Sequence, residues 1–378
     1  MSAQARAPLI VVAAGGTGGH LFPAEATAIA LAKRGAAVDL ATDERAAAYA
    51  GSFPAGTIHT VPSATFKGRD PLSLLRAGSR LGLGFGKAFK LFGRLQPAAV
   101  IGFGGYPTIP PILAARMRGI ATLIHEQNGV MGRANRLLAP RVTAIATGFP
   151  DVAAVAASDA ARLHHTGNPV RPAVVAAAAQ PFPEYGADVP LRVLVFGGSQ
   201  GAQVMADIVP AAMAKVEPAL WPHLTVTQQA RAEDVPRVRA TYGELGIAAE
   251  VAPFFNDLPD RMAQAHLIVS RSGASTVAEL AAIGRPSILV PLPHALDQDQ
   301  RANAGFLQDV GGGILIEQGA FTPDRLAVEI SELAANRDRL AAMAAAARTL
   351  GRLDAADRLA DLILEVATAH SDRLRTAT

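Results

Sequence analysis

Two stretches of the chain follow the same pattern, and that pattern decides the fold. Leu9–His20 reads LIVVAAGGTGGH, and Leu191–Ala202 reads LRVLVFGGSQGA. In each stretch an apolar run of strand length passes directly into a glycine-rich turn, and helix-compatible sequence follows, from Pro23 to Arg34 in the first case. A buried strand, a tight glycine turn and a helix form the start of a βαβ unit with a parallel sheet. The sequence therefore predicts an α/β protein with two doubly wound domains.

Further strands and loops extend each half. They are Ala98–Ile101 with Gly102–Tyr106, Ala121–Ile124 with His125–Gly129, and Leu267–Val269 with Ser270–Thr276. Ligands of such sheets bind outside the carboxyl ends of the strands, which is where these loops lie. The halves are separated by Gly167–Pro172 and a Pro-rich stretch to Pro190, which is the best linker.

Composition excludes several classes of protein. The 378 residues are 50% hydrophobic, which is too apolar for a disordered chain, and they include no cysteine. Disulfide frameworks, zinc fingers, iron–sulfur clusters and thiol nucleophiles are therefore excluded together. The longest uncharged stretch, Gln96–Ala115, contains four prolines and three glycines, so no continuous spanning helix is expected there. The N-terminal apolar run is shorter than a signal-peptide core, and we expect a soluble protein made in the cytosol.

The positive charge is concentrated in one segment. The chain carries a net +3, but Phe66–Leu95 holds seven basic residues and one acid, a net +6 that leaves −3 for the remainder. Leu and Phe are interleaved with these cations, as in a helix that lies on an anionic membrane surface. An ordinary amphipathic helix with a solvated basic face is the alternative. Four glycines between Gly78 and Gly86 predict a bent or mobile element rather than a long helix, and no fold signature indicates nucleic-acid binding.

The glycine loops are suited to binding phosphate groups. Gly15–Gly19 would place backbone N–H groups at a helix N-terminus, although Leu21 stands where the dinucleotide fingerprint needs its third glycine. Ser270–Thr276 places hydroxyl groups and N–H groups at a second helix start, with Glu279 one turn further on. A diphosphate at the N–H groups and a ribose at the carboxylate would fit a nucleotide-diphosphate ligand. Tight βα turns also need glycine, so a purely structural role stays open at each loop.

Candidates for catalysis and metal binding are few. His20 closes the first glycine loop and is a candidate general base, although a histidine at a helix start is more often a capping or packing residue. His125 and Glu126 stand together after a strand and are open to the same two interpretations. Asp297-Gln298-Asp299 matches the D-x-D of metal-dependent sugar transferases literally, but such pairs of acids are common by chance.

Several longer motifs resemble the MurG family of bacterial N-acetylglucosaminyltransferases. They are GGTGGH, GFGGYPTIPP, HEQNGVMGRANRLLA, GNPVR, VFGGSQGAQ, SRSGASTVAELAAIGRPSILVPLP and DQDQRANA, and they run in unchanged order from about Leu9 to Asn303. The resemblance implies a GT-B fold, with two Rossmann-like doubly wound parallel-sheet domains facing a central cleft. It implies an acceptor and membrane-binding domain over 1–168, a UDP-GlcNAc-binding domain over 169–350, and a C-terminal helix at about 351–378 that packs back on the first domain.

The resemblance also implies an activity: transfer of GlcNAc, with inversion, from UDP-GlcNAc to the C4 hydroxyl of undecaprenyl-pyrophosphoryl-MurNAc-pentapeptide in peptidoglycan synthesis. It further implies a peripheral location on the cytoplasmic face of the bacterial inner membrane, contact with anionic lipid through 66–95, and membership of a cell-wall and division complex. No cofactor, metal or nucleic acid is expected.

Carried over to this sequence, the resemblance implies a set of site residues. The expected contacts to UDP-GlcNAc are Thr17, Gly18, Gly19, Asn128, Arg171, Ser199, Phe255, Ala274, Ser275, Thr276, Val277, Ala278, Glu279 and Gln300. Within that set, Glu279 would hold the ribose hydroxyls and Phe255 would make a backbone contact to uracil. His20 is the candidate base, and the helix start at Gly273–Thr276, with Arg271, would stabilise the leaving diphosphate.

Three other functions stay open at this point. A UDP-GlcNAc 2-epimerase would share the architecture and the donor but would have no use for a basic, apolar patch. A non-catalytic nucleotide-sugar-binding regulator at the membrane would bind the donor without releasing UDP. An NAD-dependent dehydrogenase would use Asp39 or Asp43 as its ribose-binding acid.

Overall fold

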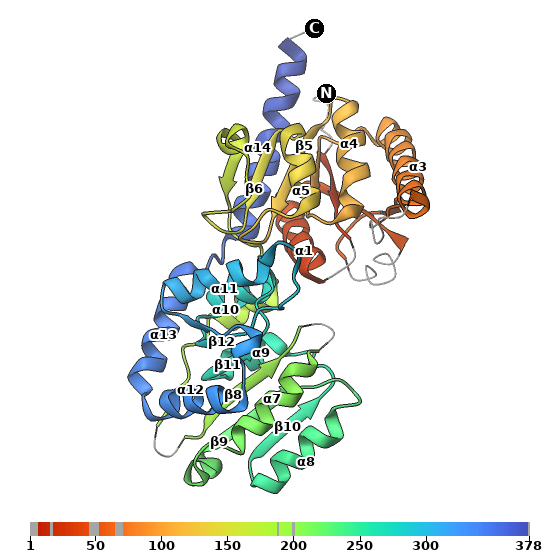
Figure 1. Cartoon of the computed structure of the whole chain (residues 1–378). Helices are drawn as coiled ribbons and strands as arrows, with labels where there is room; N and C mark the ends of the chain where they lie inside the picture. Colours follow the sequence, from red (N-terminus) through yellow and green to blue (C-terminus); the bar gives the residue numbers. More distant parts are fainter. Residues whose placement is uncertain are drawn as a thin grey trace. The chain divides into compact units, whose positions relative to one another are not determined.

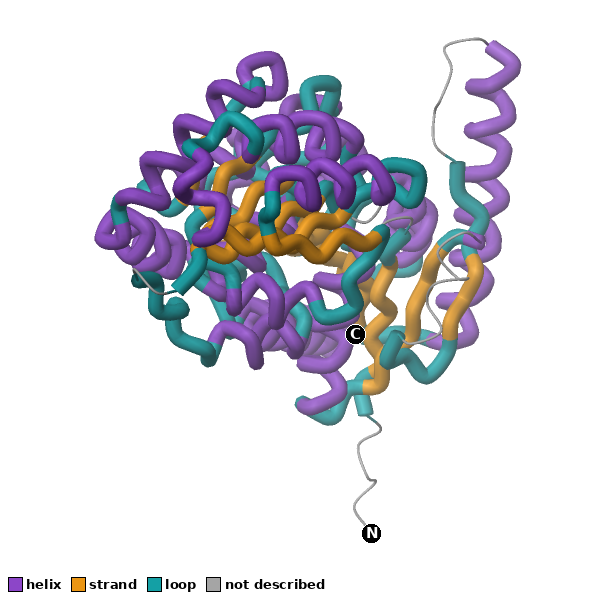
Figure 2. Tube along the Cα trace, turned by 90° about the horizontal axis from the view of Figure 1, so that it is seen from below, coloured by secondary structure: helices purple, strands orange, loops and turns teal. Residues whose placement is uncertain are grey.

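The chain forms two compact units in the computed structural model, which describes residues 7–15, 18–44, 53–64, 71–186, 189–198 and 201–376. The first unit comprises Met1–Arg171 with Asp354–Thr378, and the second comprises Pro172–Leu353. Each contains one wholly parallel sheet with helices packed around it (Figure 1; strands in orange in Figure 2). The predicted α/β class with two doubly wound sheets is thus confirmed.

The sheet of the first unit has the order β3-β2-β1-β4-β5-β6-β7 among the described residues. Its strands are β1 Leu9–Ala13, β2 Ala37–Thr42, β3 Ile58–Thr60, β4 Ala99–Gly102, β5 Ala121–Glu126, β6 Ala144–Thr147 and β7 Leu163–His165. The central strands are buried on both faces, which is why they are nearly continuous apolar runs in the sequence. Its helices are α1 Gly18–Lys33, α3 Pro71–Leu95, α4 Ile109–Met117, α5 Arg133–Leu138 and α14 Ala355–Thr376.

Helix α1 begins at Gly18, five residues before the predicted start at Pro23. Proline is favoured in the first turn of a helix, which explains the prediction. Here the two glycines after the loop already adopt helical geometry, and Pro23 lies buried inside the helix. The earlier start places His20 in the first helical turn, close to the carboxyl ends of the strands.

Helix α3 is a single helix of 25 residues, so the expectation that its glycines would prevent a long helix was wrong. Packing explains the difference, because α3 lies against α4 and its buried residues Ala88, Leu91 and Phe92 belong to the core. Gly84 is needed for this packing, since a Cβ there would lie 2.0 Å from the carbonyl oxygen of Pro62. Among the described helices, none is both long enough and apolar enough to cross a membrane.

Helix α14 belongs to the first unit although it ends the chain (Figure 1, blue). It packs against α1, and Leu359 and Ile363 are fully buried in the core beneath the sheet. Arg34 at the end of α1 pairs with Asp361 at 2.6 Å and with Asp357 at 2.7 Å. The last helix is therefore part of the core that supports α1.

The sheet of the second unit has the order β10-β9-β8-β11-β12-β13 among the described residues. Its strands are β8 Leu191–Phe196, β9 Leu224–Gln229, β10 Ala248–Ala252, β11 Leu267–Ser270, β12 Ser287–Leu289 and β13 Gly313–Leu315. Its helices are α6 Pro172–Ala178, α7 Gln203–Met213, α8 Val235–Leu245, α9 Leu258–Gln264, α10 Ala274–Ile283, α11 Asp299–Asp309, α12 Pro323–Ala335 and α13 Arg337–Leu350.

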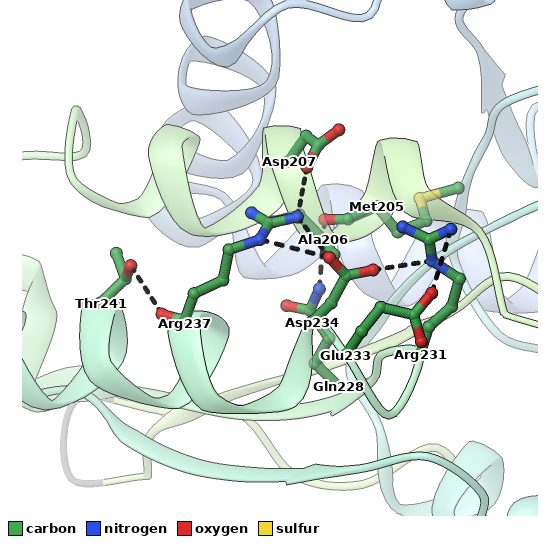
Figure 3. A network of polar contacts seen from close by, with 9 residues as sticks. All are labelled: Met205, Ala206, Asp207, Gln228, Arg231, Glu233, Asp234, Arg237 and Thr241. Carbon is green, nitrogen blue, oxygen red and sulfur yellow. Dashed lines mark hydrogen bonds and ion pairs between the residues drawn. The ribbon is translucent and has the colours of Figure 1, made fainter.

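A charged network joins α7 to the start of α8 (Figure 3). The buried carboxylate of Asp234 accepts hydrogen bonds from Arg231 Nε at 2.7 Å and from Arg237 Nη2 at 2.8 Å. Arg237 also pairs with Asp207 on α7. The hydrogen bond from Arg231 is the main reason why the pKa of Asp234 is lowered, so this carboxylate stays ionised and paired.

His266 in the second unit predicts a loss of stability in acid. The ring is fully buried; Nδ1 accepts from the backbone N–H of Arg192 at 2.9 Å, and Nε2 donates to the Glu184 carbonyl at 3.0 Å. Burial lowers the pKa of His266 to about 4. In the unfolded chain the pKa of this histidine is about 6.5, so below pH 6.5 the unfolded state binds a proton that the folded state does not. The free energy of unfolding is therefore at its full value above pH 6.5 and decreases by about 3 kcal/mol as the pH falls towards 4.

We therefore expect His266→Gln to reduce the dependence of the unfolding free energy on pH between 7 and 4. Urea unfolding at several pH values measures it, with His223→Gln, an exposed position, as the control. Parallel pH profiles for His266→Gln and the unsubstituted chain would contradict this assignment.

Candidate active site

The loops at the carboxyl ends of β1, β4, β5 and β7 form a polar cluster in the first unit. His20 in the first turn of α1 is its central titratable group, and its Nδ1 lies 3.2 Å from Gln127 Oε1. Gly104 and Gly105, with φ of 84° and 76°, pass against the imidazole, and a Cβ at Gly104 would lie 3.3 Å from its Cε1. Any larger residue in this left-handed backbone would be strained and would crowd the ring.

Burial is the main influence on His20 and lowers its pKa below the ordinary histidine value. The charge of Glu126 and hydrogen bonds to Gln127 and the Phe103 carbonyl act in the opposite direction. The imidazole is thus neutral at neutral pH, and a negative charge nearby favours the imidazolium that forms when it accepts a proton.

Glu126, at the end of β5, is 1% exposed and has hydrogen-bond donors on both carboxylate oxygens. Oε1 accepts from the backbone N–H and the Nδ2 of Asn128, at 2.9 and 3.2 Å. Oε2 accepts from the backbone N–H of Gly132 at 2.9 Å and from Asn135 Nδ2 at 2.8 Å. These four donors hold the carboxylate in the interior, where its charge acts on His20.

Gln127 and His125 complete the cluster. Gln127 Nε2 donates to the His125 carbonyl and to His125 Nδ1, both at 3.0 Å. His125 Nε2 donates to the Gly167 carbonyl at 3.1 Å, and Asn168 Nδ2 donates to the Gln127 carbonyl at 2.8 Å. Burial lowers the pKa of His125 to about 4, so this second imidazole is neutral.

The residues predicted to contact the donor are only partly grouped in this unit. Gly18 and Gly19 begin α1 beside His20, and Thr17 lies outside the described residues. Asn128 is half-buried, and its amide nitrogen donates to Glu126. Arg171 lies over the ring of Phe22 on α1, with its Cζ 4.3 Å from the ring centroid.

In the second unit, the predicted residues 274–279 form the first turns of α10. Gly273 caps the helix, Ser275 and Thr276 are half-buried, and Val277 and Glu279 face the interior. The helix begins directly beyond the carboxyl end of β11, so its first N–H groups lie at the edge of the sheet where ligands bind. The partial positive charge of a helix N-terminus suits a diphosphate.

Arg271 has a different environment from the one expected. Its guanidinium donates to the carbonyls of Val290 and Pro291, at 3.1 and 3.0 Å, and to Gln318 Oε1 at 2.6 Å. These contacts hold the loop after β12 and do not favour a role at the leaving diphosphate. Gln300 borders the same loop, where its Oε1 accepts from the backbone N–H of Leu292 at 3.0 Å.

Phe255 is buried between β10 and α9, and the Cζ of Arg261 lies 4.3 Å from its ring centroid. The backbone contact of Phe255 to uracil stays a prediction. Ser199 lies outside the described residues. The Asp297 and Asp299 carboxylates do not join a larger acidic site, since the described residues contain no group of three or more His, Cys, Asp or Glu side chains arranged to hold a metal ion.

Sequence reasoning missed Gln127, Asn135 and Asn168 in the first unit. Gln127 and Asn135 lie within the motif HEQNGVMGRANRLLA, and Asn168 lies within GNPVR, but these neutral amides were given no role. Their place inside these motifs was the available signal, but it did not show their partners, which lie up to 107 residues apart in the chain.

Two family models match the chain. The glycosyltransferase family 28 N-terminal domain matches residues 10–147, and the glycosyltransferase family 28 C-terminal domain matches residues 192–359. Together they include His20, the loop after β5 and the start of α10, while Gly167 and Asn168 lie between the two matches.

A relative in Rhodopseudomonas palustris (strain HaA2) is 63% identical over 361 residues, which are 96% of this chain and 99% of the relative. It is named UDP-N-acetylglucosamine--N-acetylmuramyl-(pentapeptide) pyrophosphoryl-undecaprenol N-acetylglucosamine transferase. The crystal structure of MurG from Acinetobacter baumannii matches with a TM-score of 0.76 and 30% identity, covering 94% of this chain and 99% of that one.

A structure described as a putative UDP-N-acetylglucosamine 2-epimerase from Listeria monocytogenes has a TM-score of 0.64 at 14% identity, covering 93% of this chain and 95% of that one. That likeness shows a shared fold alone. The motifs, the two domain matches and the near full-length identity agree: this chain belongs to glycosyltransferase family 28, and within it to the MurG family.

Proposed function

We propose that this chain transfers GlcNAc from UDP-GlcNAc to the C4 hydroxyl of the MurNAc unit in undecaprenyl-pyrophosphoryl-MurNAc-pentapeptide, with inversion at the anomeric carbon. The observation that carries the proposal is the 63% identity over almost the whole length of a relative with this name. The polar cluster around His20 and the start of α10 are the two places where the required chemistry has suitable groups.

The first unit would supply the base. The acceptor hydroxyl loses its proton to Nε2 of His20 as its oxygen forms a bond to C1 of GlcNAc. Burial keeps this imidazole neutral and able to accept the proton, and the buried Glu126 carboxylate stabilises the resulting imidazolium.

The second unit would bind the donor. The bond between C1 and the β-phosphate oxygen breaks, and its electron pair leaves with UDP. The N–H groups at the start of α10 stabilise the added negative charge, and Glu279 accepts hydrogen bonds from the ribose hydroxyls. The other predicted donor contacts stay predictions of the same kind, including those of Thr17, Arg171, Ser199 and Gln300.

UDP release from UDP-GlcNAc, with and without a polyprenyl-pyrophosphoryl-MurNAc-peptide, tests this function. We expect release only with the acceptor, together with a disaccharide product, and we expect the rate to survive EDTA because the helix N-terminus stabilises the leaving group. UDP-ManNAc formed without acceptor would indicate an epimerase. Donor binding without UDP release would indicate a regulator, and NADH binding without UDP binding would indicate a dehydrogenase.

We also propose that α3 contacts an anionic membrane surface, where the lipid-linked acceptor is available. Its outer face carries Arg76, Arg80, Lys87, Lys90 and Arg94, all exposed. These cations recur at intervals of three, four or seven residues and therefore share one face of the helix.

Two large apolar side chains accompany the cations of α3. Leu75 is 70% exposed and Leu83 is 68% exposed, so both are available to enter the lipid interface. The remaining charges of the predicted patch, at Lys67, Arg69 and Asp70, lie outside the described residues. A peripheral location at the inner membrane follows from this proposal, and contacts within a cell-wall and division complex stay a prediction.

Removal of two cations from α3 is expected to weaken membrane binding. Each cation near an anionic surface contributes about 1 kcal/mol, so Lys87→Gln with Lys90→Gln should lower partition into phosphatidylglycerol vesicles about 30-fold. Vesicle co-sedimentation measures this effect. Lys33→Gln with Arg352→Gln, two exposed cations outside α3, is the matched control. Equal partition of the unsubstituted chain into phosphatidylglycerol and phosphatidylcholine vesicles would refute the proposed surface.

A further inference from the structure

The cluster around His20 contains an ordered chain of hydrogen bonds that ends on a backbone carbonyl. It runs from His20 to the side chain of Gln127, then to His125, and then to the Gly167 carbonyl. Gln127 is 2% exposed and His125 is fully buried, so water does not compete for these contacts. The two imidazoles and the amide can each donate at one atom and accept at another, and the Gly167 carbonyl can only accept. The donor and acceptor of every hydrogen bond in the series can therefore be assigned.

The amide of Gln127 has only one acceptable orientation. Its Nε2 lies 3.0 Å from the carbonyl oxygen of His125, which carries no hydrogen and can only accept. The opposite orientation would place two carbonyl oxygens against each other in the interior, without solvent to separate them. Nε2 therefore faces His125, and Oε1 faces His20.

The His125 ring agrees independently with this orientation. Its Nε2 faces the Gly167 carbonyl and must carry a hydrogen, so its Nδ1 has the lone pair that accepts from Gln127 Nε2. Asn168 holds the backbone of the same glutamine by donating to its carbonyl at 2.8 Å. The carbonyl oxygen and the Nδ1 of His125 are thus two separate acceptors, and both require Gln127 Nε2 to face His125.

We propose that Gln127 is a positioning residue that holds the neutral His20 imidazole in its Nδ1–H form and leaves the lone pair on Nε2. Gln127 Oε1 can only accept, so the His20 nitrogen that faces it must donate. This inference rests on the proposed function in one respect: only if His20 is the general base does the lone pair on Nε2 become the atom that accepts the proton. The tautomer itself is a property of the protein without substrate and can be measured without any transfer.

The test is a long-range ¹H–¹⁵N NMR correlation of the protein labelled with ¹⁵N-histidine at neutral pH. The chain has nine histidines, and the His20 signals are identified by their loss in His20→Ala. We expect a pyrrole-type Nδ1 and a pyridine-type Nε2 for His20. The competing form carries the hydrogen on Nε2 and the lone pair on Nδ1, and finding it in the unsubstituted chain would overturn the proposal.

Gln127→Met keeps the length of the side chain and removes both hydrogen-bonding groups. We expect a mixture of His20 tautomers, and a kcat lower by about tenfold or more with little change in KM for UDP-GlcNAc; a fully reversed tautomer costs up to about 10⁴-fold in triad enzymes. His125→Phe should disturb the tautomer less, because the backbone carbonyl at position 125 still orients Gln127.

The matched control is Gln228→Met. Gln228 is a buried glutamine on β9 that donates to the Met205 carbonyl and accepts from Tyr242. It should leave the His20 signals unchanged even where it lowers stability. An unchanged His20 tautomer in Gln127→Met would overturn the positioning role. An Nδ1–H tautomer in a chain that transfers no sugar would overturn the proposed function and leave the tautomer assignment intact.

Discussion

His20→Ala is expected to lower kcat for GlcNAc transfer by about 10²- to 10⁴-fold, which is the usual contribution of a general base. The KM for UDP-GlcNAc should change little, because the proposed diphosphate and ribose contacts lie on α10. His20 has the geometry for the role: it lies in the first turn of α1, is neutral because of burial, and is close to the charge of Glu126.

The pH profile gives a second measurement of the same assignment. Protonated His20 cannot accept a proton, and its pKa lies below the ordinary value of about 6.5. The rate should therefore hold as the pH falls through 6.5 and decline only at lower pH. UDP release with a short-chain acceptor measures both effects, and His370→Ala, on α14, is the control. Near-normal turnover of His20→Ala would remove the base assignment.

Arg285→Met is expected to lower the free energy of unfolding of the second unit by about 3 kcal/mol or more. The Arg285 side chain is fully buried and lies at the turn between α10 and β12. Its guanidinium donates to five backbone carbonyls, those of Pro181, Met262, Ala263, Ile283 and Gly284. Loss of the guanidinium would remove a hydrogen bond from each of these buried carbonyls, although the Met262 carbonyl would keep the Ala265 N–H and the Ile283 carbonyl would keep Arg348.

Burial, together with the nearby charge of Arg348, lowers the pKa of Arg285 to about 10, so the group is still a cation at neutral pH. Arg285→Lys should be intermediate, because one ammonium group has three donors and cannot reach carbonyls on three separate segments. The cation thus ties the segment after α6 to α9 and to the end of α10.

Urea unfolding followed by the fluorescence of Trp221 measures the effect directly, because the single tryptophan of the chain lies in the second unit. Arg301→Met is the control: Arg301 is 63% exposed and paired with Glu317, and such surface pairs contribute little. Equal urea midpoints for Arg285→Met and Arg301→Met would show that the buried cation does not stabilise this unit.

The sequence predicted the core of the fold well because buried parallel strands are apolar on both faces. Leu9–Ala13 and Leu191–Phe196 are such strands, and each passes into a glycine loop at the predicted place. Local propensity was less informative where packing decides the structure. The glycines of α3 suggested a break, but the contact between Gly84 and Pro62 makes a glycine necessary inside a continuous helix.

The candidate site also contains some residues that the sequence could indicate and others that it could not. His20, Glu279 and the start of α10 could be proposed from the sequence alone, because a glycine loop between a strand and a helix is a local pattern with a known chemical use. The partners of His20 could not. Gln127 lies 107 residues away in the chain, and only the parallel order of β1, β4 and β5 brings it to the imidazole.

By itself, the sequence determined the fold class, the family motifs and the chemical types available at the strand ends, because these depend on short-range patterns of apolar residues and glycine. The tertiary structure alone decided that Arg271 holds a loop, that Arg285 joins three segments, and that an amide chain orients His20. Those roles depend on hydrogen-bond donors and acceptors that meet only when distant segments pack together, and no local pattern encodes such a meeting.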